Sequence, residues 1–264
     1  MTADRPQDGP PAPHGSEEDP VLPTLRTLGV GPGTGPEPLQ GAERDRVLPL
    51  LAAARVAPGF MPDDEGTALY EAARTVAVPG PLLEVGSWMG RSALYLAAAA
   101  RETGRQVVTV DHHRGSEEHQ PGWEYHDPAL VDPAIGLLDT LPRFRRTIAD
   151  AGAEDVVIAV VARSETLAPL WTTPLALLFL DGSHTEESAR RDQDAWVAKL
   201  AVGGTLAIHD VFPDPADGGQ APYGVYRRVV ASGEFTELPG TGSLRLLRRL
   251  PRRPGQPIPA IPAG

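Results

Sequence analysis

The chain has 264 residues, 41% of them hydrophobic, with no cysteine and a net charge of −11. The length suits one α/β domain with extensions, and the hydrophobic content is sufficient for a full core. The negative charge argues against nonspecific binding to nucleic acid or to anionic membranes. No apolar run reaches the length of a membrane span, and residues 1–20 lack the apolar core of a secretory signal. Together with the absence of cysteine, this predicts a cytoplasmic protein.

Composition divides the chain into three parts. Residues 1–40 are polar and rich in Pro and Gly, so we expect a disordered or irregular extension. Residues 250–264 form a second Pro-rich stretch, which is expected to be an unstructured tail. The periodic apolar segments lie between them, and they predict one folded domain over residues 41–249.

Within this domain, strand patterns alternate with helix patterns, which predicts a parallel sheet with helices on both faces. Helices are expected at residues 41–57 and 65–76, before the first strand. Pro142 is expected to kink or restart a later helix, and Gly203 with Gly204 to end the helix before the fifth strand. After the first strand, the predicted strands are 106–110, 156–161, 175–180 and 205–208, the helices 136–149, 165–170, 185–199 and 225–231, and a closing antiparallel pair 235–238 and 243–247.

Residues 82–96, LLEVGSWMGRSALYL, predict a strand, a glycine turn and the start of a helix. Gly86 can take backbone angles closed to other residues, and Gly90 permits a close approach to the helix start. A helix N-terminus offers free N–H groups and the positive end of a dipole. Glu84 is an acid inside the apolar strand and needs a partner there. The alternative is an ordinary strand-to-helix turn without a ligand.

A second acid, Asp111, ends the strand at residues 106–110. Nucleotide-binding folds place an acid there to hold ribose hydroxyls. The glycine pattern is E-x-G-x-x-x-G and lacks the G-x-G-x-x-G of dinucleotide sites, which disfavours a dehydrogenase.

With these motifs, the chain resembles class I S-adenosylmethionine-dependent methyltransferases. The resemblance implies a Rossmann-like fold with a mostly parallel seven-stranded sheet, and S-adenosylmethionine as the cofactor. In that family the glycine turn passes under the methionine part of the cofactor, and the acid of the second strand holds the ribose. The implied cofactor-binding residues are Glu84, Gly86, Ser87, Gly90, Ser92, Asp111, His112, Ser164 and Asp181.

Polar residues also follow the fourth and fifth strands. Asp181 ends the fourth, and His209 with Asp210 ends the fifth, so the three side chains are expected to meet. Carboxylate oxygens suit Mg²⁺ or Mn²⁺, and an imidazole suits Mn²⁺, Fe²⁺ or Zn²⁺. The alternative is that Asp181 caps the next helix and that His209 and Asp210 form hydrogen bonds without a metal.

This second pattern is similar to metal-dependent sugar O-methyltransferases of the macrocin type. The resemblance implies that Asp181, His209 and Asp210 bind a divalent metal and that His184 is the general base. The family more often has a carboxylate at the position of His209. A metal that chelates two neighbouring hydroxyls lowers the pKa of one, and His184 would remove that proton.

Residues 112–126 are too rich in polar and aromatic groups for a plain connection. They predict either a surface lid or a substrate wall in which Trp123 or Tyr125 stacks on a sugar or an aromatic acceptor. A histidine of this segment is the alternative base. The segment also offers the ligands of a less favoured second metal site, formed by Glu117, Glu118, His119 and Asp127.

GSEEHQPGWEYHDP together with PADGGQAPYGVY resembles an actinobacterial methyltransferase group associated with the mycofactocin glycan. We therefore expect an O-methyltransferase that acts on a sugar hydroxyl of a glycan or a glycosylated metabolite. The alternatives are a phenol or catechol O-methyltransferase, a nucleotide-sugar or NAD enzyme, and a noncatalytic nucleotide-binding module. The expected partner is a small-molecule or oligosaccharide acceptor, without nucleic acid or membrane insertion, and homo-oligomers remain open.

Overall fold

The computed structural model describes residues 41–123, 125–182 and 184–251, which all belong to one compact unit spanning Pro36 to Gly264. The extension predicted over residues 1–40 and nearly all of the predicted tail lie outside the described residues. Within the described part of the chain, no helix is long and apolar enough to cross a membrane.

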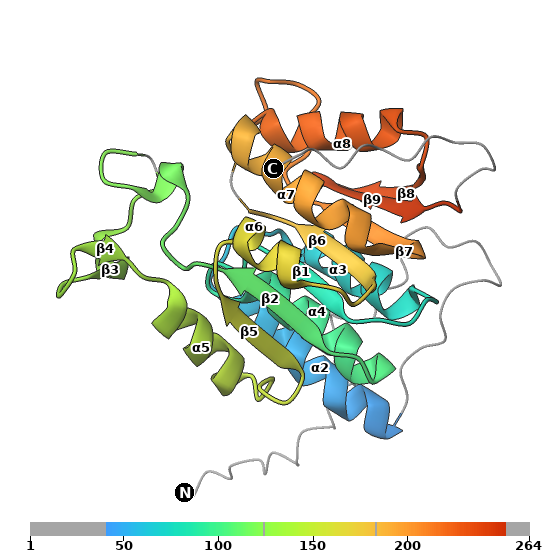
Figure 1. Cartoon of the computed structure of the whole chain (residues 1–264). Helices are drawn as coiled ribbons and strands as arrows, with labels where there is room; N and C mark the ends of the chain where they lie inside the picture. The colour runs from blue at the N-terminus through green and yellow to red at the C-terminus, as the bar shows by residue number, and fades with distance from the viewer. Residues whose placement is uncertain (1–40, 124, 183, 252–264) are drawn as a thin grey trace, which may run out of the picture. The chain divides into compact units, whose positions relative to one another are not determined.

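A seven-stranded sheet forms the centre of this unit (Figure 1). The strand order is β5-β2-β1-β6-β7-β9-β8, and every pair from β5 to β7 is parallel. β9 lies antiparallel between β7 and β8, which confirms the predicted closing pair. The bounds are β1 Leu82–Val85, β2 Val107–Asp111, β5 Val157–Val161, β6 Leu175–Leu180, β7 Leu200–Ile208, β8 Phe235–Thr241 and β9 Leu244–Arg249.

Helices cover both faces of the sheet, as predicted (Figure 1). On one face α4 packs against α2 and α3, while α7 packs against α6 and α8 on the other. Phe144 and Ile148 of α5 contact the start of α4 near Gly90. The bounds are α2 Gly41–Val56, α3 Asp63–Thr75, α4 Arg91–Thr103, α5 Leu141–Asp150, α6 Ser164–Leu167, α7 Glu186–Trp196 and α8 Ala221–Ala231.

Helices cover both faces of the central strands of the sheet, and these strands are formed by mostly apolar runs. Every residue of β1 and β6 is buried. Continuous apolar strands are typical of parallel sheets with helices on both faces. The carboxyl ends of these strands therefore emerge from a rigid core.

Two local predictions were wrong. The helix expected from residue 136 begins at Leu141, because Pro142 occupies its first turn, where the missing N–H costs nothing. The residues before it form β4 (Leu137–Leu138), which pairs with β3 (Val131–Asp132). Gly203 and Gly204 do not precede a strand but lie inside β7, where the pairing with β6 shifts register. A Cβ on Gly204 would lie 2.9 Å from the carbonyl oxygen of Ala176, so glycine permits this close pairing.

Candidate active site

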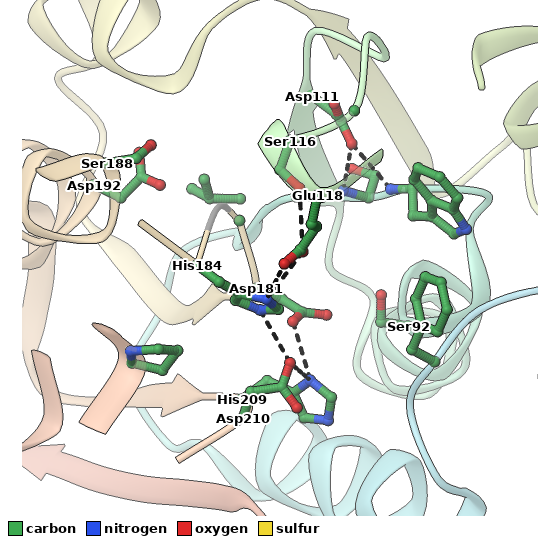
Figure 2. Close-up of a pocket in the computed structure, with 18 of the residues that line it drawn as sticks. Ser92, Asp111, Ser116, Glu118, Asp181, His184, Ser188, Asp192, His209 and Asp210 are labelled. Atoms are coloured by element: carbon green, nitrogen blue, oxygen red, sulfur yellow. Dashed lines mark hydrogen bonds and ion pairs between the residues drawn. The ribbon is translucent and has the colours of Figure 1, made fainter. Parts of the chain in front are cut away.

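A cavity of about 490 Å³ opens at the carboxyl ends of β1, β2, β5, β6 and β7 (Figure 2). Its size lies in the usual range for small-molecule sites. The cofactor-binding, metal-binding and general-base residues implied by the resemblance all line it, except Glu84 and Gly90. Glu84 is buried beneath the glycine turn, and Gly90 packs against α5. The strand ends thus bring the predicted residues to one place.

The glycine turn is shaped by the neighbouring strand end. Gly86 has a φ of +87°, and a Cβ there would lie 2.1 Å from the carbonyl oxygen of Asp181. Gly90 caps α4 at a φ of +97°, where a Cβ would contact Phe144 at 3.3 Å. Gly86 is therefore required by both backbone angle and space, whereas Gly90 is required mainly by its angle.

Gly86→Ala is expected to lower the free energy of unfolding by about 2–4 kcal/mol, because the methyl group meets a backbone carbonyl. Gly104→Ala is the matched control, since Gly104 has a φ of +68° and open space around it. The control should cost only about 1 kcal/mol, from the backbone angle alone. Urea denaturation of both variants measures the difference, and equal losses would contradict the assigned contact.

Asp111 holds the glycine turn in place through backbone hydrogen bonds. Its Oδ2 accepts from the N–H groups of Ser87 and Trp88, each at 2.9 Å, and its Oδ1 accepts from that of His113 at 2.7 Å. A carboxylate has about four lone-pair sites, so acceptor capacity toward the cavity remains. This second task of Asp111 was not predicted from the sequence.

Glu84 has the partner that its buried position requires. The Ser92 hydroxyl donates to Oε1 at 2.5 Å, whereas Oε2 has no aligned hydrogen bond, although the Ser87 hydroxyl lies nearby. Burial raises the pKa of Glu84 to about 8, against the opposing effect of Ser92. The carboxyl group is thus mostly protonated at neutral pH in the folded chain.

This pKa predicts a pH-dependent stability. Between pH 4.5 and about pH 8 the folded chain keeps a proton that the unfolded chain releases, so stability falls as the pH rises through this window. The contribution of Glu84 to the slope approaches about 1.4 kcal/mol per pH unit. Denaturation of the wild type and of Glu84→Gln across the window measures it. The variant should show a smaller slope, and parallel curves would contradict the assignment.

Asp181, His184 and Asp210 form an acidic and imidazole cluster in the cavity (Figure 2). Each offers one ligand atom, and these atoms lie within 4.8 Å of one another. His184 Nε2 lies 3.1 Å from Asp210 Oδ2, and its Nδ1 lies 3.0 Å from Glu118 Oε1. Hydrogen bonds to Asp210 and Glu118 raise the pKa of His184 to about 10.

His209 lies behind this cluster and is almost fully buried. Its Nδ1 is 3.0 Å from Asp181 Oδ1, and its Nε2 is 2.8 Å from Glu65 Oε2. The second contact joins opposite charges without an aligned hydrogen bond. Burial lowers the pKa of His209, but the charge of Asp181 and the hydrogen bonds to carboxylates outweigh it and raise the pKa to about 12. Both ring nitrogens of this predicted ligand therefore face carboxylates.

The two carboxylates of the cluster, Asp210 and Asp181, differ in their local backbone environment. Asp210 has a φ of +55°, a conformation uncommon outside glycine that costs about 1–3 kcal/mol. Burial raises the pKa of Asp210, but contacts with His184 and His209 outweigh burial and hold the pKa well below its usual range. Asp181 does not cap α7, because Thr185 is the N-cap and accepts from the N–H of Ser188 at 3.3 Å. The capping alternative for Asp181 is therefore wrong.

The segment at residues 112–126 contacts the site through Glu118 and an aromatic cluster formed by Phe60, Trp88, His119 and Tyr125. The rings of Trp88 and His119 lie 4.2 Å apart, and those of Phe60 and Tyr125 lie 5.7 Å apart. All four residues line the cavity, whereas Trp123 does not. Of the two predicted stacking residues, only Tyr125 is in place.

The histidines of this segment have separate environments. His112 and His119 both line the cavity, so each remains an alternative base. His113 bonds with Thr140, and His126 with the carbonyl oxygen of His119. The second metal site predicted for this segment is not assembled among the described residues, because Glu118 contacts His184 while Asp127 caps a short turn at Ala129.

Sequence reasoning did not assign Glu65, Glu118 and Asp192 to the positions that they take at the site. Glu65 resembles an ordinary acid in the first turn of α3, and Glu118 was predicted only as a ligand of the second metal site. Asp192 of α7 lines the cavity and accepts from the Ser164 hydroxyl. The adjacent acids Glu117 and Glu118 stood out in the sequence because they lie in an unusually polar connection. Glu65 and Asp192 lie within ordinary helix patterns, so nothing in the sequence marked them.

Comparisons with known proteins agree with this geometry. The sequence model of a family described as a methyltransferase domain matches residues 83–211, just under half of the chain. The SAH-bound methyltransferase PaMTH1 of Podospora anserina is 15% identical, with a TM-score of 0.53 and coverage of 91% of this chain and 99% of that one. The O-methyltransferase NovP is 17% identical, with a TM-score of 0.57 and coverage of 79% and 98%. CalS11, a TDP-rhamnose 3'-O-methyltransferase of calicheamicin biosynthesis, is 18% identical, with a TM-score of 0.50 and coverage of 88% and 96%.

The chain has the Rossmann-like class I methyltransferase fold, as predicted. At these identities the solved structures establish the fold, and the family match adds the methyltransferase domain. The matched range contains the glycine turn, Asp111, Asp181 and Asp210. The match therefore supports a methyltransferase domain around the site.

Proposed function

We propose that the chain is a metal-assisted O-methyltransferase that methylates a sugar hydroxyl of a glycan or a glycosylated metabolite. The main support is the cluster of Asp181, His184 and Asp210, which shares one cavity with the glycine turn. A methyl donor held by the turn and an acceptor held by the cluster would lie within the same cavity, and proximity of this kind supplies much of the rate of a transfer.

The residues around the turn fit S-adenosylmethionine. Asp111 would accept from the ribose hydroxyls, and Ser87 and Ser92 border the same cavity. One buried polar atom near the turn, Trp88 Nε1, has no hydrogen-bond partner in the described part of the chain. Buried polar atoms of native proteins are normally paired, so this atom is a candidate for a contact with the cofactor.

The donor set also fits a divalent metal ion. Asp181 and Asp210 each offer carboxylate oxygen, the ligand type that Mg²⁺ and Mn²⁺ prefer. We assign the metal to these two residues. Binding through His209, the third ligand predicted from the sequence, would require its ring to leave Glu65 or Asp181. When bound, such an ion lowers the pKa of a coordinated hydroxyl.

We assign the role of general base to His184. Glu118 faces Nδ1 and can fix the tautomer, which leaves Nε2 directed at the cluster. With a pKa of about 10, His184 carries a proton at neutral pH, so its role as a base requires this pKa to fall. Asp210 is one of the two groups that raise the pKa, and a cation bound to Asp210 would neutralise its charge and so lower the pKa of His184. The same Nε2 cannot serve as a metal ligand and accept a proton, so the two roles are experimentally separable.

A sugar acceptor is favoured over a phenol or catechol because CalS11, a similar fold, is a TDP-rhamnose 3'-O-methyltransferase. The half-exposed ring of Tyr125 at the cavity suits the apolar face of a sugar. An oligosaccharide of the mycofactocin type is a narrower version of this proposal.

The location of the protein in the cytoplasm and the possible formation of homo-oligomers stay predictions from the sequence.

Turnover is expected to depend on a divalent metal. The test incubates the protein with S-adenosylmethionine and a panel of glycosides, sugar nucleotides and catechols, and detects a mass gain of one methyl group. Chelation should abolish the transfer, and Mg²⁺ or Mn²⁺ should restore it. Activity unchanged by chelation would contradict the metal assignment, and transfer to catechols alone would contradict the sugar acceptor.

A further inference from the structure

Glu65 is a buried carboxylate that contacts the candidate site from outside the methyltransferase motifs. It lies in the first turn of α3, with its side chain 5% exposed. Its Oε2 is 2.8 Å from His209 Nε2, and the other ring nitrogen of His209 faces Asp181 and Asp210 at 3.0 and 3.4 Å. One imidazole thus links Glu65 to both carboxylates of the proposed metal site.

The turn between β8 and β9 is built around the same carboxylate. Ser243 donates to Glu65 twice, from its N–H at 2.7 Å and from its hydroxyl at 3.0 Å. Gly242 has a φ of +51°, and a Cβ there would lie 2.1 Å from Glu65 Oε1. Two hydrogen bonds from this turn therefore hold the Glu65 carboxylate, and Gly242 leaves the space that the carboxylate occupies.

Glu102 offers a comparison with Glu65, because it is an acid of similar burial whose contacts do not lead to the site. Glu102 is also buried in a helix, but it bonds with Tyr70 and Arg74, which are outside the cavity. Its side chain is 8% exposed, so its burial matches that of Glu65. A purely structural role would make the two acids equivalent for the site.

We propose that Glu65 is a positioning residue: it holds His209 by Nε2, so that Nδ1 fixes Asp181 and Asp210 at the spacing a divalent cation requires. The inference rests on the proposed metal-assisted function. Partners behind the ligands of metal sites orient those ligands, and their loss typically weakens metal binding by about 10–100-fold. His209 is then the link that orients the two ligands, and it does not bind the metal.

The test measures Mn²⁺ binding by electron paramagnetic resonance in the full chain without acceptor. Glu65→Gln should bind Mn²⁺ about 10–100-fold more weakly than the wild type. Its affinity for S-adenosylhomocysteine should stay within about threefold, because Glu65 has no described contact with the glycine turn. Glu102→Gln, the matched control, should lower the Tm and leave Mn²⁺ affinity unchanged.

A double variant tests the link through the imidazole. If Glu65 acts through His209, then Glu65→Gln and His209→Asn should each weaken Mn²⁺ binding. The Mn²⁺ affinity of the double variant should then equal that of the single variant with the lower affinity, because both changes break the same link. Any of three results would overturn the role given to Glu65 without affecting the proposed function. These are a wild-type Mn²⁺ affinity in Glu65→Gln, an equal loss of Mn²⁺ affinity in Glu102→Gln, and additive losses in the double variant. Failure of the wild type to bind Mn²⁺ would overturn the metal-assisted function as well.

Discussion

Replacement of His184 by alanine is expected to lower kcat by about three orders of magnitude while the affinity for S-adenosylhomocysteine stays within a few fold. General bases contribute about 10²–10⁴-fold to the rate. His184 is held between Glu118 and Asp210 and has no described contact with the glycine turn or with Asp111. Single-turnover kinetics and calorimetry on the same variant separate the two quantities.

Two further histidines serve as controls for this prediction. His126→Ala should leave kcat near the wild-type value, because its ring bonds with the carbonyl oxygen of His119 and does not line the cavity. His112→Ala tests one of the two alternative bases, since His112 lines the cavity, as His119 does. If turnover depends on His112 and not on His184, the assigned base is wrong. If His184→Ala also abolishes Mn²⁺ binding, His184 is a ligand.

Asp111→Ala is expected to weaken S-adenosylhomocysteine binding by about two orders of magnitude. Hydrogen bonds to a charged group are worth about 1.5–3 kcal/mol, and the variant loses the proposed ribose contacts. It also frees the N–H groups of Ser87 and Trp88, which shape the turn. Calorimetric titration of the folded variant measures the loss.

Asp139→Ala is the matched control for Asp111. Asp139 also accepts a hydrogen bond from a backbone N–H, that of Leu141 at 3.1 Å, but it does not line the cavity. The control should lose some stability and keep its affinity for S-adenosylhomocysteine. A wild-type affinity in Asp111→Ala, or an equal loss in both variants, would contradict the role given to Asp111.

The sequence could predict the residues that follow parallel strands. Asp111 ends β2, Asp181 follows β6 and Asp210 follows β7, and all three line the cavity. The reason is geometric, because the carboxyl ends of parallel strands meet at one edge of the sheet. Strand periodicity and the glycine turn therefore predicted most of the site.

Residues that reach the site from other elements could not be found in this way. Glu65 and Ser243 are 178 positions apart, and Glu118 and His184 are 66 positions apart. Periodicity carries no information on such long-range contacts. The orientation of His209 is likewise set by Glu65 and Asp181, which the local sequence around His209 does not specify. The bonds from Asp111 to the turn depend on backbone angles that a linear pattern cannot give.

The most direct test of the central claim is calorimetric titration of S-adenosylmethionine and S-adenosylhomocysteine into the purified chain, with and without Mg²⁺ or Mn²⁺. Binding of both ligands with dissociation constants of about 1–100 μM is the predicted result, which corresponds to about 5–8 kcal/mol. Asp111→Ala should abolish most of this heat. A folded wild type that binds neither ligand, with or without metal, would contradict the assignment of the cavity as a methyl-donor site.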